Sequence, residues 1–255
     1  VQQELKIAYG NTLNLQIEIC SITHKKALEH VFAKYHPQIV INAAAHKHVP
    51  LMEHNCIEAI YNNVFGTQNL VELCEKYEAE RFMMVSTDKA VNPTNVMGAT
   101  KRMCEMIVQS ASTHGKVKYS ATRFGNVLGM GQPVKIMDLA ENMIRLSGVQ
   151  GIEIVETGLR PGEKLYEELL VKTEELDKTS NSMIFIERDS ALSPEEINTR
   201  LNMLREVCET GDDSQAREVL RKAVPTFKKP EEVNRAAEFV VHQKKSEPER
   251  EEAVA

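Results

Sequence analysis

The sequence predicts an α/β fold, in which a partial parallel sheet with helices on both faces is followed by a mostly helical C-terminal region. Two observations predict it. Through the first half of the chain, short runs rich in Val, Ile and other apolar residues alternate with longer amphipathic segments. Beyond Gly129 most segments are helical in pattern. Alternation of the first kind is typical of buried parallel strands that are connected by helices.

Each element is predicted by its own periodicity and end signals. Gly10-Asn11 ends the first helix, Thr23 is placed to cap the second, and Ser193 opens a capping box with Pro194 at the first helical position. The predicted strands are 13–22, 38–42, 81–86, 116–123 and 152–155. The predicted helices are 1–9, 24–34, 53–77, 96–114, 134–146, 160–170, 194–209 and 213–223.

Composition and charge exclude several classes of protein. The chain has 255 residues, of which 42% are hydrophobic and 27% are charged, as in an ordinary globular domain. The net charge of −6 argues against a nucleic-acid-binding protein. Five cysteines, none in a C-x-x-C pair, fit a reduced cytoplasmic protein whose cysteines are mostly small core residues. No apolar run is long enough to span a bilayer, so a location at the cytoplasmic face of the inner membrane would need an anchor preceding Val1.

Residues that could carry chemistry gather where the third predicted strand ends. Asp88 and Lys89 place an acid and a base side by side there, and ligands bind beyond the carboxyl ends of strands in open α/β sheets. Lys101 lies one helix turn after Met97, so these two residues share a helix face. An isolated Asp-Lys pair is more simply a capped loop with solvated charges. We interpret this one as part of a functional site because Ala43-Ala44-Ala45, Asn63 and Lys101 accompany it.

The run His46-Lys47-His48 has the spacing of two metal ligands. Zinc sites usually need three or four protein ligands, and no third ligand is evident in the sequence. We therefore expect no metal site. The run is interpreted as a loop with polar contacts, in which Lys47 lies near a substrate phosphate.

Five blocks of sequence, taken in order, resemble the capsular-polysaccharide (CapD-like) branch of the UDP-N-acetylglucosamine 4,6-dehydratases, in the extended short-chain dehydrogenase/reductase family. The blocks are AAAHKHVPLME at 43–53, NVFGT at 63–67, STDKAVNPTNVMGATK at 86–101, RFGNVLG at 123–129 and LRPGEKL at 159–165. Relatives usually carry a catalytic Tyr at the position of Met97, and a Met there is itself typical of this branch. The resemblance covers most of residues 1–172.

The resemblance implies a reaction and its cofactor. NAD or NADP would oxidise a UDP-N-acetylhexosamine at C4, the C5 proton and the C6 hydroxyl would leave, and the hydride would return to C6. Asp88 would protonate the departing hydroxyl. Lys89 would remove the C5 proton, and burial and the neighbouring Lys101 would help to deprotonate it. Because Met97 cannot titrate, the C4 proton would need another route, for example through water to Asp88. Thr87 would hydrogen-bond the sugar.

The resemblance also implies binding residues and partners. The implied cofactor contacts are Ser21, Ala43, Ala44, Ala45, Asn63, Ser86 and Lys101, with Ser21 standing where relatives carry an acid near adenine. The implied substrate contacts are Lys47, His48, Asn126, Arg160 and Glu163. Arg160 suits a phosphate because its planar fork donates two hydrogen bonds. Asn63 is equally interpreted as a buried helix residue that satisfies backbone groups. Relatives are commonly oligomeric, so a homo-oligomer is expected.

The sequence departs from the family pattern in two places. It contains no Gly-rich phosphate loop, so the first strand-helix-strand unit of a dinucleotide-binding, Rossmann-like domain is lacking. The strand 13–22 would then pair directly with the strand 38–42 or leave a gap in the sheet. A segment is also lacking near Gly129-Met130. The expected division is a partial dinucleotide-binding domain at 1–129, a remnant of the substrate-binding subdomain at 130–172, a helical region at 173–243 and a disordered tail at 244–255.

Two other functions stay open at this point. A related sugar-nucleotide epimerase or reductase would share the fold, but epimerases rely on the Tyr that Met97 replaces and lack the adjacent Asp88 and Lys89. A non-catalytic remnant or interaction module is the other hypothesis, with the C-terminal helices as its working surface.

The lack of a phosphate loop predicts weak dinucleotide binding by the 255-residue chain and little or no turnover. We expect that denaturing the purified chain releases far less than one equivalent of NAD(H), which enzymatic cycling or mass spectrometry measures. A stoichiometric NAD(H) complex that survives purification would contradict this prediction.

Overall fold

A computed structural model describes residues 2–125, 136–155, 158, 162, 164, 175–178, 180, 185–188 and 191–233 of the chain. The predicted helix at 160–170 and the predicted tail at 244–255 lie outside these residues, apart from Gly162 and Lys164.

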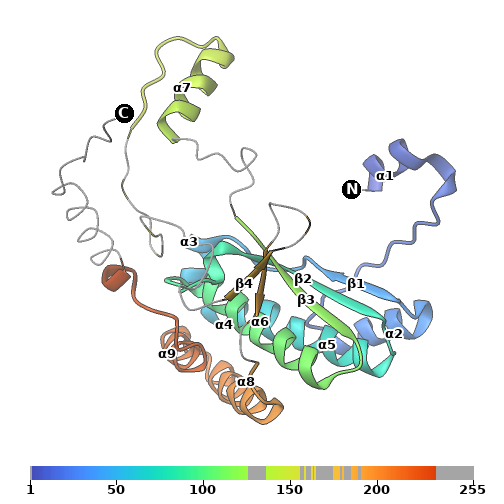
Figure 1. Cartoon of the computed structure of the whole chain (residues 1–255). Coiled ribbons are helices and arrows are strands. Elements are labelled where there is room, and N and C mark those ends of the chain that lie inside the picture. The colour runs from blue at the N-terminus through green and yellow to red at the C-terminus, as the bar shows by residue number, and fades with distance from the viewer. Residues whose placement is uncertain are drawn as a thin grey trace, which may run out of the picture.

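A parallel sheet of three strands forms the centre of the described structure, in the order β1 (Ile39–Asn42), β2 (Arg81–Thr87) and β3 (Lys118–Phe124) (Figure 1). Arg81 is in register with Ile39 on one side and with Lys118 on the other. The carboxyl ends of all three strands therefore meet at one edge of the sheet. This confirms the predicted α/β class with its parallel sheet.

Helices α2 (Lys25–Tyr35), α5 (Gly66–Lys76) and α6 (Val96–His114) lie together on one side of this sheet (Figure 1). Beneath them Phe82 and Met84 are completely buried. On the opposite face Ile39 and Ile41 are each 61% exposed. Among the described residues, the helices that cover this sheet thus lie on one face. The reason is that both crossovers, β1-α5-β2 and β2-α6-β3, run in the same direction across the sheet, so a shared right-handed sense puts both helices on one face.

The prediction of a strand at 13–22 is wrong. After α1 (Gln2–Tyr9) and the 3₁₀ turn η1 (Gly10–Thr12), this segment is extended but pairs with no described strand. Its apolar alternation finds no neighbouring strand, and Ile19 is fully exposed. Side chains hold it in place of a strand: Lys34 Nζ donates to Glu18 Oε1 at 2.8 Å, and Asn69 Nδ2 donates to Ile22 O at 3.0 Å. Of the two alternatives for the sheet, the one without direct pairing to β1 is observed.

The expected helix at 53–77 is interrupted. It consists of α3 (Val49–Glu53), α4 (Cys56–Ala59), a π-helical turn η2 (Ile60–Phe65) and α5. The breaks are located where polar residues take up backbone groups, beginning with Asn55, whose side chain donates to Leu51 O at 2.8 Å. The predicted Thr23 cap is likewise absent, because His24 is the N-cap of α2 and makes no side-chain capping bond.

The elements after β3 follow their predicted bounds in most places. α7 (Ile136–Ser147), α8 (Pro194–Glu209) and α9 (Asp213–Ala223) are helical as expected, and the capping box joins Ser193 and Glu196 in both directions. Residues 152–155 are exposed and form no strand. A hairpin of β4 (Glu175–Lys178) and β5 (Phe185–Arg188) was not predicted, since its charged segments lack strand periodicity.

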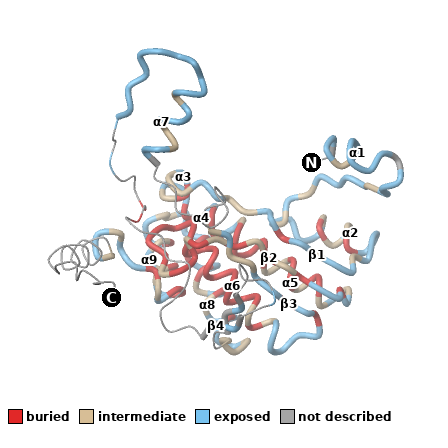
Figure 2. Tube along the Cα trace, turned by 45° about the horizontal axis from the view of Figure 1, so that its top comes forward, coloured by how far each residue is buried: buried red, intermediate tan, exposed pale blue. Residues whose placement is uncertain are grey.

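The C-terminal helices share one core with the sheet. α8 and α9 pack against α6, and Leu204 and Leu220 are completely buried there. Figure 2 shows the buried residues gathered around α6. Next to α6 on the same side of the sheet, α5 contacts both β1 and α6. The buried core therefore extends from the sheet through α6 to the C-terminal helices.

Four cysteines belong to this core, as expected from the sequence. They are Cys56, Cys74, Cys104 and Cys208. Burial raises the pKa of the Cys74 thiol to about 12, and burial likewise raises that of Cys208 to about 11. Thiols in such surroundings stay protonated and behave as small apolar groups.

A charged cluster lies within the core where α6 crosses the sheet. The Glu105 carboxylate on α6 accepts from Ser86 Oγ of β2 at 2.7 Å and from Arg123 of β3 through Nε and Nη2, both at 2.8 Å. Arg102 Nη1 donates to it at 3.1 Å. Burial acts to raise the pKa of Glu105, but the hydrogen bond and charge of Arg123, the charge of Arg102 and the Ser86 hydroxyl outweigh burial and lower it. The carboxylate thus ties the ends of β2 and β3 to one helix.

Replacing Glu105 by Gln should destabilise the fold by about 3 to 5 kcal/mol at pH 7, since two arginines would lose their buried counter-charge. Because the folded pKa of Glu105 is depressed, its contribution is full above 4.5, its ordinary value, and is lost as the pH falls through the lower folded value. The difference between wild type and variant should therefore shrink in acid. Urea unfolding across this pH range measures it.

Glu206→Gln is the matched control, because Glu206 is exposed on α8 and its loss should change stability by less than about 0.5 kcal/mol. Equal stability of Glu105→Gln and wild type at pH 7 would refute the assigned role of the cluster.

Candidate active site

The loop after β2 brings the predicted acid and base into contact. Asp88 begins a 3₁₀ turn, η3 (Asp88–Ala90), and its side chain is only 4% exposed. Thr87 Oγ1 donates to Asp88 Oδ1 at 2.8 Å, and Lys89 Nζ pairs with the same oxygen at 3.3 Å. The Lys89 side chain is 29% exposed. An acid buried in the protein is thus joined to a base that reaches solvent.

The first turn of α6 packs directly against this loop. A Cβ atom on Gly98 would lie 2.1 Å from Lys89 O, so only glycine permits the observed approach. Asn95 caps the turn by accepting from Gly98 N at 2.7 Å. Met97 and Lys101 are both buried, and Lys101 Nζ donates to Val85 O at 2.6 Å. The predicted neighbours of the acid-base pair are therefore held on one helix beside it.

Asn63 connects the loop after β1 to α6. Its Oδ1 accepts from His46 N at 2.8 Å, and its Nδ2 donates to His46 O at 3.1 Å and to Thr100 Oγ1 at 2.9 Å. The side chain is completely enclosed within η2. These bonds match the interpretation of Asn63 as a buried residue that satisfies backbone groups. The same bonds hold His46 in the loop after β1, so the predicted contact of Asn63 with the cofactor stays a prediction.

The loop after β1 presents small residues to solvent. Asn42 is buried and accepts from Ala44 N at 3.1 Å, which shapes the start of the loop. Ala43 and Ala44 are exposed, and Ala45 is half-buried. A flat ligand could approach the backbone here, because no side chain projects beyond a methyl group.

The remaining predicted residues of this loop have local partners. His48 Nδ1 accepts from Leu51 N at 3.3 Å and so caps α3. His46 Nε2 lies 3.1 Å from Glu58 Oε1. Lys47 is exposed. Within the described residues, no group of three His, Cys, Asp or Glu side chains is arranged to hold a metal ion.

Two predicted cofactor residues are not brought to the acid-base pair. The Ser86 hydroxyl is turned to Glu105, on the face of β2 that carries Phe82 and Met84. Ser21 is exposed at the end of the unpaired segment 13–22, where its hydroxyl lies 2.8 Å from that of Thr23.

Three predicted substrate residues, Asn126, Arg160 and Glu163, lie outside the described residues. Their neighbours in the sequence are nevertheless attached to the site. Gly162 O accepts from Thr94 Oγ1 at 3.0 Å and from Asn95 Nδ2 at 3.1 Å. Lys164 Nζ donates to Val91 O at 2.8 Å. These attachment residues were not predicted from the sequence, although the position of Asn95 just before an apolar helix is typical of a helix cap.

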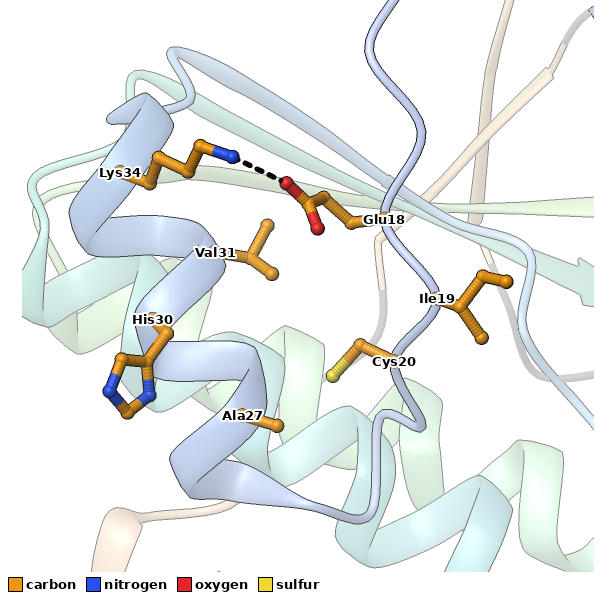
Figure 3. Close-up of a pocket in the computed structure, with 7 residues that line it drawn as sticks. All are labelled: Glu18, Ile19, Cys20, Ala27, His30, Val31 and Lys34. Carbon is orange, nitrogen blue, oxygen red and sulfur yellow. Dashed lines mark hydrogen bonds and ion pairs between the residues drawn. The ribbon is translucent and has the colours of Figure 1, made fainter.

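A pocket of about 330 Å³ lies elsewhere, between the extended segment 18–20 and α2 (Figure 3). Glu18 and Lys34 approach each other across it at 2.8 Å, and Cys20 and His30 are on its wall. None of its lining residues belongs to the loops after β1 or β2. We do not assign it to the site.

The described residues fit one end of a dinucleotide only. Ala43 and Ala44 follow the carboxyl end of β1, and the Lys101 ammonium on α6 reaches Val85 O near the carboxyl end of β2, where a nicotinamide ribose would lie. A pyrophosphate needs a cradle of backbone amides, and no Gly-rich run in the sequence supplies one. The α6 N-terminus does not replace it, because Asn95 and Glu53 already accept from its amides.

No helix among the described residues combines the length and apolar character needed to cross a membrane.

Comparison with known proteins identifies relatives of named activity. The chain is 41% identical to the capsular polysaccharide biosynthesis protein CapD of Staphylococcus aureus, over 68% of this chain and 39% of the relative. It is 41% identical to a UDP-N-acetylglucosamine 4,6-dehydratase (inverting) of Campylobacter jejuni, over 35% of this chain and 28% of the relative. The chain thus spans about two fifths or less of the length of these relatives.

Among solved structures, Pen from Bacillus thuringiensis is 30% identical, with a TM-score of 0.45, over 56% of this chain and 44% of that structure. The family described as polysaccharide biosynthesis protein matches residues 1–130 and 127–189. This match spans well over half of the chain, which therefore belongs to the family of polysaccharide biosynthesis proteins.

Proposed function

We propose that this chain carries the acid-base half of a nucleotide-sugar 4,6-dehydratase that acts on a UDP-N-acetylhexosamine in polysaccharide biosynthesis. The observation that supports it best is the contact of Asp88 with Lys89 at the carboxyl end of β2, beside the buried Lys101. Family membership and the named dehydratase relative support the same reaction. NAD or NADP, when bound, would supply the oxidation at C4 and the hydride returned to C6.

The acid-base step follows from the geometry of the pair. In the ion pair, Lys89 holds the proton that Asp88 needs to act as an acid. Passing that proton across the 3.3 Å contact produces a neutral amine and a neutral carboxyl group together. The neutral amine can then take the C5 proton of a 4-keto sugar, and the carboxyl group can protonate the C6 hydroxyl as it leaves as water.

The step also restores itself. After elimination Lys89 carries the C5 proton and Asp88 is again a carboxylate, so the ion pair is re-formed. One further proton transfer from Lys89 to Asp88 prepares the next turnover. Thr87, which donates to Asp88 Oδ1, fixes the orientation of the carboxyl group.

An epimerase is the less favoured function. The residue four positions before Lys101 is the buried Met97, which cannot exchange a proton with a sugar hydroxyl. Epimerisation at C4 also has no use for an acid and a base placed side by side at the strand end.

A partial reaction tests the acid-base half without any cofactor. A 4-keto-6-deoxy UDP-N-acetylhexosamine already has the ketone that makes its C5 proton acidic. Incubated with the chain in D2O, it should exchange that proton for deuterium, and NMR of the C6 methyl group follows the exchange. Replacing Lys89 by Met should slow the exchange about 100-fold or more, because the base is removed.

Lys26→Met provides the matched control, since Lys26 is an exposed lysine on α2 and belongs neither to the loops after β1 and β2 nor to α6. It should exchange at the wild-type rate. If wild type and Lys89→Met both exchange only at the rate of buffer, the proposed function is wrong for this chain.

A further inference from the structure

The C-terminal helix α9 is joined to the start of α6 through one buried carboxylate. Glu53 Oε1 accepts from Val96 N, the first amide of α6, at 2.7 Å. Glu53 Oε2 pairs with Arg217 Nη1 of α9 at 2.7 Å, and Arg217 Nη2 donates to Glu53 O at 2.6 Å. The Glu53 side chain is only 8% exposed. One arginine thus fixes both ends of the residue that caps the site helix.

Further bonds hold the same corner. Asp213, in the first turn of α9, accepts from Ile57 N at the start of α4 at 2.8 Å. Just after α9, Lys228 N donates to Pro93 O at 3.0 Å, in the turn that leads into α6. The C-terminal segment therefore contacts both α4 and the turn that precedes α6. Its own position is set by the buried Ala216 and Leu220.

The first turn of α6 is where the site depends on exact placement. Gly98 approaches Lys89 O in that turn, and Lys101 follows one turn later. A carboxylate at a helix N-terminus also interacts favourably with the helix dipole. Without Arg217, the buried carboxylate of Glu53 would lose its counter-charge and turn toward water, which releases Val96 N.

We propose that Arg217 is a positioning residue for the active site, acting through Glu53 on the first turn of α6. The proposal rests on the proposed function, and it extends the site to a helix beyond residues 1–189, where the family match ends. On this view the C-terminal helices brace the acid-base pair and are not a separate interaction module.

The test compares Arg217→Ala with wild type in the full 255-residue chain. Amide hydrogen exchange, read by mass spectrometry, should be about tenfold faster in peptides covering 95–99 and unchanged in β3. The kcat of C5 deuterium exchange should fall about tenfold while KM stays within about twofold, because displacement of α6 affects the reacting groups and not the binding of the nucleotide. Arg217→Lys should restore part of both effects, since it keeps the charge but donates from one point.

Lys222→Ala is the matched control, because it removes an exposed cation from the same helix. It should leave both measurements at wild-type values. Unchanged exchange at 95–99 in Arg217→Ala, or exchange that is faster in β3 as well, would overturn the positioning role. If the wild type fails to exchange the C5 proton, the proposed function falls, and the amide exchange at 95–99 still decides whether Arg217 holds α6.

Discussion

The enclosure of helix α6 is the constraint on which the rest of the structure depends. Fourteen of its nineteen residues are buried, and they include Lys101, Arg102 and Glu105. Charged groups removed from water must find partners within the protein. Lys101 donates to the carbonyl of Val85. Glu105 accepts hydrogen bonds from Ser86, Arg102 and Arg123. Because Val85 and Ser86 lie on β2 and Arg123 lies on β3, the buried helix holds the ends of both strands, where the site is built.

The same enclosure explains why the C-terminal helices belong with the sheet. A helix covered by strands on one side still exposes its outer side unless another layer packs there. α8 and α9 provide that layer, with Leu204 and Leu220 completely buried. Polar contacts accompany the packing, since Arg200 of α8 donates to Ala223 O of α9 at 2.6 Å. The resulting layer is tied to the start of α6, so packing and positioning of the site have one structural origin.

How much could be predicted from the sequence depends on whether the signal was local. The bounds of α6 and α9 were predicted to the residue from their helical periodicity, and in the structure Asn95 and Asp212 cap them. The strand predicted at 13–22 was wrong, because alternating apolar and polar residues form a strand only where a neighbouring strand is present to pair with them. The Asp88-Lys89 contact was predictable from adjacency. The bond between Glu53 and Arg217 was not, since 164 positions separate them and neither has a local motif.

The orientation of the Ser86 side chain was predictable in principle, although it was assigned to the cofactor. Its hydroxyl could have been assigned to the buried face, because Phe82, Met84 and Ser86 alternate with period two on one strand. Because successive side chains of a strand point to opposite faces, Ser86 and Thr87 point in opposite directions, and Thr87 donates to Asp88. The described contacts that hold Asp88 and Lys89 come from β2, α6 and, through Glu53, α9, and none involves the segment before α2. The proposed acid-base chemistry on a ketone can therefore be tested separately from dinucleotide binding, although Lys101 lies beside the pair and is also an implied cofactor contact.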